Sequence, residues 1–502
     1  MKKKDIGKKA KQGILWSGAS SVILFVTRFG TSMILARLLF PEDFGLMGMA
    51  TVVIQFAQRL TSFGFNLAVV QRKKLEPEHL DTVFTINLLF LSCITAIVYF
   101  AADYVSNFFN NTLLAPILRV VSVLFILRGL MSVNQAILMR KMKFKELAFA
   151  HIFSQSVTFI SPIFFALANY GVWSLVWGRV LGASTASCVL FYHTRWYPKF
   201  KFRIWALKDI FSFGAWIFVV RYLTYFINKL DYIFIGKFLG ASELGFYERA
   251  YNLMDIPRGQ LQSVTSNVLF SSYSKIQDDD ERIVKVLKKV IISVSVLAYG
   301  MSIWMFFAAP SLIVTLFGHQ WTSSILPLKI MCFSGLVYAM TILFFPILNA
   351  KSLMAKRAGC QFIYLTILAT SMWYGLERGI VGVAWSVTIS SSCYLVLILL
   401  LISSNLPFSP KDFLLAQRSA FVYGCIQVAV LMTFCHFAKN FLTETSILML
   451  IGITGLSAVT YGGSLWLIKF EEVQEPLEDM LKEFRKLAKK VPVLKSLLGE
   501  SK

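Results

Sequence analysis

Long apolar runs separated by short polar connections make up most of the chain between residues 13 and 468. Each run is long enough to cross the hydrocarbon core of a bilayer, which takes about 20 residues of helix. The pattern therefore predicts an all-α polytopic membrane protein with about fourteen transmembrane helices. We place these spans at 13–36, 45–70, 82–102, 115–139, 147–169, 172–192, 211–236, 245–271, 288–309, 325–349, 359–376, 379–402, 417–438 and 446–468.

Composition supports this interpretation and excludes several others. Of the 502 residues, 56% are hydrophobic and 15% are charged, whereas an average soluble domain has about 25% charged residues. A soluble protein this apolar could not cover its surface with polar groups, and a disordered chain needs the opposite composition. The net charge of +23 would suit a nucleic-acid-binding protein, but the hydrophobicity does not, so we expect no nucleic-acid partner.

The basic residues are distributed unevenly over the predicted connections. With the N-terminus in the cytoplasm, the cytoplasmic segments carry 36 Lys and Arg and the outer loops carry 4. Such a bias is typical of cytoplasmic loops, and it predicts an even number of spans with both termini in the cytoplasm. It also predicts contact with anionic membrane lipids, most of all through a basic amphipathic tail at 471–502.

The chain contains an internal repeat, in which positions of the first 200 residues match positions 200 residues later. Without gaps, this offset aligns Trp16 with Trp216, Arg37 with Lys237, Asp43 with Glu243 and Gly45 with Gly245. Each repeat contains six spans, so both enter the membrane in the same orientation and should be related by an axis along the membrane normal. We therefore predict an N-lobe at 1–200, a C-lobe at 201–405, two extra helices at 406–470, and a central cavity between the lobes.

Polar side chains follow helical spacing on the first two spans of each lobe, which places each set on one helix face. The sets are Ser17, Ser21, Arg28 and Thr31 or Ser32; Gln55, Arg59, Ser62 and Asn66; Arg221, Tyr225, Asn228 and Tyr232, with Asp231 beside them; and Asn252, Asp255, Arg258 or Gly259, and Gln262. A polar stripe in the same place in both lobes indicates the lining of a shared cavity.

Ten cations and three acids fall within the predicted spans. A charge at the bilayer centre is costly, so some of these must reach the membrane surface and others must face a polar interior. The net positive charge favours an anionic ligand, and the planar fork of arginine suits phosphate. We predict that phosphate or pyrophosphate of an amphiphilic substrate binds in this cavity to Arg28, Arg59, Arg221, Arg249, Arg258, Asn66, Asn228 and Asn252.

Other roles are open for several charged groups. Each arginine could instead reach the membrane surface or pair with an acid, and we expect surface positions for Arg119 and Lys329. Asp231 and Asp255 could couple transport to an ion, although ion pairs with Lys229 and Arg258 are the favoured reading. The scattered Cys and His residues have no metal-ligand spacing, so we expect no metal site, no disulfide and no cofactor.

Several segments resemble bacterial polysaccharide flippases, the Wzx-like, colanic-acid-exporter type of the MATE-like (MOP) superfamily. They occur in order along the chain at 34–45, 63–73, 230–240, 244–247, 274–279 and 317–321. The resemblance implies two six-helix bundles plus two extra helices, with helices one, two, seven and eight around the cavity. This chain departs from the family pattern at Ser62, where relatives commonly have an acid, and at Ser271, where many have proline.

The resemblance further implies a non-enzymatic flippase in the bacterial cytoplasmic membrane. Its substrate would be an undecaprenyl-pyrophosphate-linked oligosaccharide for surface polysaccharide synthesis, moved by alternating access. A polysaccharide polymerase and glycosyltransferases would be its partners, and we expect a monomer. The alternatives are a lipid II or drug exporter of the same fold, or a membrane glycosyltransferase or polymerase. A cationic cavity argues against a cation exporter, and short outer loops argue against an enzyme.

Overall fold

The computed structural model describes residues 23–60, 77–198, 215–468, 470 and 472–474. Within these ranges, the side chains of residues 60, 77, 215–221, 257, 258, 260–272 and 274 lie outside the description. All regular elements of the described part are helices. Contacts divide the chain into two compact units, Met1–Glu248 and Arg249–Lys502. The division falls inside one helix, and the lobe boundary at residue 200 stays a prediction.

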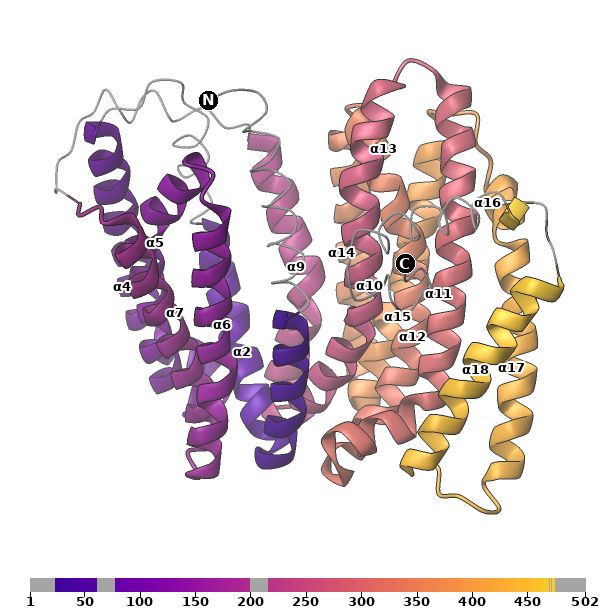
Figure 1. The fold of residues 1–502 in the computed structure, drawn as a ribbon, viewed down its shortest axis with the longest axis horizontal. Helices are drawn as coiled ribbons and strands as arrows, with labels where there is room; N and C mark the ends of the chain where they lie inside the picture. The colour runs from indigo at the N-terminus through magenta and orange to yellow at the C-terminus, as the bar shows by residue number, and fades with distance from the viewer. Residues whose placement is uncertain (1–22, 61–76, 199–214, 469, 471, 475–502) are drawn as a thin grey trace, which may run out of the picture. The chain divides into compact units, whose positions relative to one another are not determined.

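The first unit is built around a group of antiparallel helices joined by short connections (Figure 1). Helix α5 packs against both α4 and α7, α7 packs against α6, and α2 packs against α9. A further helix covers residues 23–38. The bounds are α2 Pro41–Leu60, α4 Pro77–Phe108, α5 Leu114–Arg140, α6 Phe144–Leu167, α7 Val172–Thr194, α9 Ala215–Phe238 and α10 Ala241–Lys275.

The second unit centres on α11, a helix of 38 residues that packs against α12, α17 and α18 (Figure 1). Helix α15 joins this group by packing against α12 and α14. The bounds are α11 Asp280–Phe317, η1 His319–Ser324, α12 Ile325–Thr341, η2 Ile342–Phe344, α13 Phe345–Ala350, α14 Met354–Gly375, η3 Leu376–Arg378, α15 Gly379–Ser403, α16 Pro410–Ala416, α17 Arg418–Ala438 and α18 Ile447–Leu467.

Nine helical segments in the described part are long and apolar enough to cross a membrane. One of these segments, Met354–Ser403, is 50 residues long and contains both α14 and α15. The all-helical membrane fold predicted from the sequence is therefore confirmed. The total of fourteen spans stays a prediction, because parts of the first, second and seventh predicted spans, and many side chains of the eighth, lie outside the description.

Two glycines allow α2 and the start of α10 to cross at backbone contact within the first unit. A Cβ atom added to Gly45 would lie 1.7 Å from the carbonyl oxygen of Ala241, and one added to Gly245 would lie 1.9 Å from that of Pro41. The contact is reciprocal, because 41 and 45 correspond to 241 and 245 in the 200-residue repeat. Small residues let helix backbones approach this closely in membranes.

Helix α16 is tied to α11 by one carboxylate. Lys288 Nζ lies 2.8 Å from Asp412 Oδ1, and the backbone N–H of Ser409 donates to Asp412 Oδ2 at 2.9 Å. The Ser409 side chain in turn accepts from the backbone N–H of Asp412, which completes a capping box at the start of α16. The hydrogen bond from Lys288, followed by that from Ser409, holds the pKa of Asp412 below its ordinary value.

The Asp412 contacts predict a small, pH-dependent effect. A carboxyl whose pKa is lower in the folded than in the unfolded protein stabilises the folded state at pH values above its unfolded-state pKa. This stabilisation is lost as the pH falls through its folded-state pKa. We therefore expect Asp412→Asn to lower stability by up to about 1 kcal/mol at pH 7. Thermal melts of the detergent-purified protein should show the difference at pH 7 and lose it as the pH falls below the folded-state pKa of Asp412. Asp278→Asn, at an exposed carboxylate, is the control and should change neither melt.

Candidate functional site

A group of charged side chains gathers in the first unit from three helices. Arg179 in α7 donates from Nη1 to Oγ1 of Thr51 in α2 at 2.9 Å. The Arg179 charge also interacts with Glu248 in α10 and with Arg28 in the helix at 23–38. Arg179 and Glu248 are half-buried, whereas Arg28 is exposed. Two guanidinium groups against one carboxylate leave a net positive charge, so this group can bind an anion.

An aromatic wall lies beside Arg59 at the contact between α2 and α9. The Phe56 ring centroid is 5.6 Å from those of both Tyr222 and Tyr225. The buried Tyr225 hydroxyl donates to the carbonyl of Val52 at 2.7 Å, which fixes α9 against α2. The half-buried Arg59 interacts electrostatically with the hydroxyls of Tyr222 and Tyr225. A cation therefore lies near two tyrosine hydroxyls of an aromatic cluster, an arrangement suited to a ligand with charged and ring-shaped parts.

A buried carboxylate lies farther along α9. Asp231 is 3% exposed and accepts hydrogen bonds from the Tyr247 hydroxyl and the Tyr232 backbone N–H, both at 2.9 Å. Lys229, whose Nζ lies 3.8 Å from the Tyr232 ring centroid, interacts electrostatically with Asp231. One turn earlier, the half-buried Asn228 donates from Nδ2 to the Thr224 carbonyl at 2.7 Å. The tyrosine hydroxyl of α10 thus supplies a partner that the sequence did not indicate.

The predicted residues of the second unit have different environments. Arg249 is 6% exposed, and its guanidinium carbon lies 5.5 Å from the Phe317 ring centroid and 5.3 Å from that of Trp321. Aromatic faces that contact a guanidinium stabilise its charge inside a protein. Three residues farther on, Asn252 is exposed, and Asp255 is half-buried. Arg249 therefore has protein partners of its own, while Asn252 is accessible to a ligand.

Three predicted ligand-binding residues cannot be placed in this way. Asn66 lies outside the described residues, as do the side chains of Arg221 and Arg258. Among the predicted residues that are described in the first unit, Arg28 comes close to Arg179, and Arg59 comes close to Tyr222 and Tyr225. The sequence indicated Arg179 as unusual, because it is one of the ten cations within the predicted apolar spans. The roles of Thr51 and Tyr247 had no such signal, because each depends on contacts between helices.

Nothing among the described residues offers a metal site: no three His, Cys, Asp or Glu side chains come together there. The seven cysteines are free thiols in the structure. The chemistry that this part of the chain presents is charge, hydrogen bonding and aromatic surface. It is the chemistry of a binding site.

Comparison with solved structures identifies the fold. The lipid II flippase MurJ, in an inward closed conformation, superposes with a TM-score of 0.68 at 16% identity over 89% of this chain and 98% of MurJ. An inward-facing multidrug resistance MATE family transporter of the MOP superfamily superposes with a TM-score of 0.60 at 13% identity, over 84% and 99% of the two chains. The chain therefore has the MOP-superfamily fold, as its sequence predicted.

Curated relatives are identical to this chain at about a quarter of the aligned positions. The lipopolysaccharide biosynthesis protein WzxC of Escherichia coli is 24% identical over 66% of this chain and 68% of its own length. The teichuronic acid biosynthesis protein TuaB of Bacillus subtilis is 24% identical over 77% and 81%. The succinoglycan biosynthesis transport protein ExoT of Rhizobium meliloti is 28% identical over 62% and 64%.

The chain also matches the sequence pattern of a protein family over more than half of its length. The sequence pattern of a family described as "polysaccharide biosynthesis protein" matches residues 34–326. This stretch is more than half of the 502 residues and runs from the end of the first predicted span into α12. It includes all six segments on which the flippase resemblance rested, so that resemblance is confirmed. The chain belongs to this family of polysaccharide biosynthesis proteins.

Proposed function

We propose that the protein is a flippase that moves an undecaprenyl-pyrophosphate-linked oligosaccharide from the cytoplasmic to the outer leaflet of the bacterial cytoplasmic membrane. Its two lobes would expose the site alternately to the two sides, with both chain termini in the cytoplasm. No bond is made or broken in this process, so no catalytic residue is needed. A monomer can perform it, and a polymerase and glycosyltransferases would use and supply the substrate.

The observation that carries the proposal is the group of arginines on membrane-depth helices of the first unit. Arg179 interacts with Arg28 and with one carboxylate, that of Glu248, and Arg59 lies beside Tyr222. Arginine binds phosphate oxygens through two parallel N–H donors, and such charge-assisted hydrogen bonds are strong in a low-dielectric site. A pyrophosphate would satisfy this excess of cations, and the neighbouring aromatic faces would contact sugar rings.

The other predicted residues would contribute to substrate binding in the same site. Arg221, Arg249 and Arg258 would add cations, and three amides would hydrogen-bond to the glycan: Asn66, Asn228 and Asn252. Because Arg249 packs on aromatic rings, we assign it the smallest share of the binding. For Asp231 and Asp255, the proposal keeps ion coupling and ion pairing as the two possible roles.

The names of the relatives support the class of cargo and not one particular polymer. They refer to lipopolysaccharide, teichuronic acid and succinoglycan, which are three different polysaccharides. A site that holds the shared lipid pyrophosphate by charge would serve all such substrates. The glycan would then be selected by the shape of the site around the sugars.

The proposal is tested in a strain that lacks this protein. We expect lipid-linked oligosaccharide to accumulate in the inner leaflet and surface polysaccharide to disappear, with both effects reversed by the gene on a plasmid. The accumulated lipid should be detected by mass spectrometry, and its leaflet by accessibility to an added glycosidase in right-side-out vesicles. Normal surface polysaccharide without accumulation would overturn the proposal.

A pair of arginine variants tests the site itself. Arg59→Gln should reduce export roughly 10- to 100-fold, because it removes charge-assisted hydrogen bonds worth about 1.5–3 kcal/mol. Arg119→Gln is the matched control, since Arg119 is paired with Asp103 at 2.6 Å and both side chains are exposed. Export is measured as polysaccharide per molecule of membrane-inserted protein in the complemented strain. Equal export by the two variants would exclude Arg59 from the site.

A further inference from the structure

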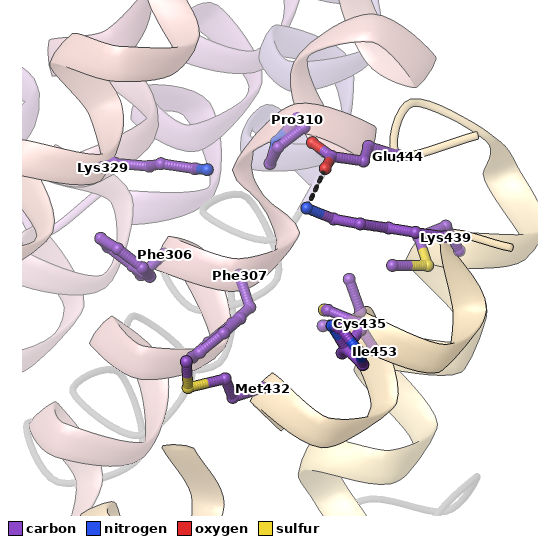
Figure 2. Close-up of a pocket in the computed structure, with 11 residues that line it drawn as sticks. Phe306, Phe307, Pro310, Lys329, Met432, Cys435, Lys439, Glu444 and Ile453 are labelled. Atoms are coloured by element: carbon purple, nitrogen blue, oxygen red, sulfur yellow. Dashed lines mark ion pairs between the residues drawn. The ribbon is translucent and has the colours of Figure 1, made fainter. Parts of the chain in front are cut away.

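A pocket of about 260 Å³ lies in the second unit, between α11, α12, α17 and α18 (Figure 2). Its charged groups are Lys329 near the start of α12, Lys439 directly after α17, and Glu444 in the connection to α18, and the imidazole of His436 in α17 also lines it. In the predicted topology, this end of the helices faces outside. The pocket shares no residue with the arginine group of the first unit, and the proposed transport reaction does not use it.

Two lysines approach the pocket from opposite sides. In Figure 2, the side chains of Lys329 and Lys439 extend toward one another from α12 and α17. Lys439 Nζ lies 2.7 Å from Glu444 Oε1. Lys329 Nζ lies 5.6 Å from the Phe306 ring centroid, and no carboxylate of the described residues lies within ion-pair distance of it. With one acid for two lysines, these groups carry a net charge of +1.

Apart from His436 and Cys435, the rest of the pocket is apolar, and it reaches an exposed surface. Phe306 and Phe307 of α11 form one side, and Met432 of α17 lies beside them (Figure 2). Met432 is 65% exposed, and Phe437, five residues farther along α17, is 62% exposed. Large exposed apolar side chains on a membrane-spanning helix face the lipid chains. A ligand of this pocket would therefore meet cations at one end and the lipid phase at the other.

We propose that this pocket binds the headgroup of a membrane phospholipid with a single negative charge, such as phosphatidylglycerol. Its phosphate lies between Lys329 and Lys439, and an acyl chain leaves along Phe306 and Met432. A phosphodiester neutralises the net charge of +1, whereas a free phosphate dianion would overcompensate it and leave the apolar side without a partner. The volume is below the roughly 300–1,000 Å³ of drug-sized sites, which fits a headgroup whose chains remain in the membrane.

The full-length protein, delipidated in dodecyl maltoside, provides the test. We titrate it with phosphatidylglycerol, with phosphatidylcholine of the same chains, and with inorganic phosphate, and measure bound lipid by native mass spectrometry and stability by thermal melting. We expect phosphatidylglycerol alone to bind with defined stoichiometry and to raise the melting temperature. Equal binding of phosphatidylcholine, or displacement of phosphatidylglycerol by millimolar phosphate, would overturn the proposal.

Charge variants locate the binding. Lys329→Gln and Lys439→Gln should each weaken phosphatidylglycerol binding about tenfold, because each removes a charge-assisted contact to the phosphate. Lys237→Gln is the matched control, since Lys237 Nζ lies 5.2 Å from the Phe108 ring centroid, much as Lys329 lies from Phe306. Equal affinities for the Lys329 and Lys237 variants would overturn the assignment.

One further variant should increase the affinity, which a misfolded protein would not do. Glu444→Gln frees Lys439 from its internal partner and raises the net charge of the pocket to +2. We expect phosphatidylglycerol to bind several-fold more tightly, with a steeper dependence on salt concentration. Unchanged or weaker binding by a variant with a normal thermal melt would contradict a phosphate position between the two lysines.

Discussion

Replacing Gly45 with alanine should prevent most of the protein from folding, or lower its stability by about 3 kcal/mol or more. The new Cβ atom would lie 1.7 Å from the carbonyl oxygen of Ala241, whereas carbon and carbonyl oxygen atoms normally stay about 3.3 Å apart. The opposing atom belongs to a helix backbone, so α2 and α10 must separate, which places the cost at the upper end of overpacking effects. Size-exclusion chromatography of the fluorescently tagged protein measures the folded yield, and detergent melts measure the stability.

Two comparisons make this result specific to the helix crossing. Gly30→Ala, in the helix at 23–38, is the control, because no atom of the described residues, apart from the local helix backbone, lies within 4 Å of the added Cβ. It should be neutral or slightly stabilising, since alanine favours helix by about 1 kcal/mol over glycine. The double variant Gly45→Ala/Gly245→Ala should cost less than the two single costs combined, because one separation relieves both clashes. Additive costs, or a normal yield for Gly45→Ala, would contradict the contact.

Most of the helices could be predicted from the sequence because the bilayer sets their length and composition. The predicted span at 115–139 corresponds to α5, Leu114–Arg140, and the tight turn before residue 172 separates α6 from α7. Helix ends at prolines were less predictable. The span predicted at 288–309 stops before Pro310, yet α11 continues through it to Phe317, because neighbouring helices in a membrane protein can accommodate the lost hydrogen bond.

The opposite error occurs one helix later. The sequence predicted a continuous span at 325–349, whereas α12 ends at Thr341 and a 3-10 turn covers Ile342–Phe344. Pro346 explains the break, because it has no N–H to donate to residue 342 and its ring clashes with that carbonyl. Both prolines have the same local signature, an apolar run on either side. Their different outcomes depend on the packing around them, which a single sequence does not contain.

The candidate site was predictable only residue by residue. Charge within an apolar run identified Arg28, Arg59 and Asp231, and helical spacing placed Arg28 and Arg59 each on a polar face of its own helix. The contacts that build the site join helices that are far apart in the sequence. Thr51 and Arg179 are separated by 128 positions, and Val52 and Tyr225 by 173. The repeat aligned Gly45 with Gly245, but it could not indicate that each faces a residue of the other copy. Such pairings are fixed by tertiary packing.

Removing the Tyr247 hydroxyl should destabilise the protein by about 2–3 kcal/mol. That hydroxyl donates to Asp231 Oδ2 at 2.9 Å, and Tyr247 and Asp231 are 0% and 3% exposed. Tyr247→Phe keeps the ring in place and takes one donor away from a buried carboxylate, a loss that costs more for a charged acceptor than for a neutral one. The free energy of unfolding is measured by titration with SDS in dodecyl maltoside micelles.

Tyr225→Phe is the matched control for the effect of charge. Tyr225 is also buried, at 2% exposed, but its hydroxyl donates to the neutral carbonyl of Val52 at 2.7 Å. Its loss should cost about 1 kcal/mol, the usual value for a neutral hydrogen bond. A double-mutant cycle then isolates the pair: with Asp231→Asn present, the cost of Tyr247→Phe should fall to a similar value. If Tyr247→Phe costs the same with either residue at position 231, the hydroxyl does not stabilise a charged carboxylate, and Asp231 must be balanced by other groups.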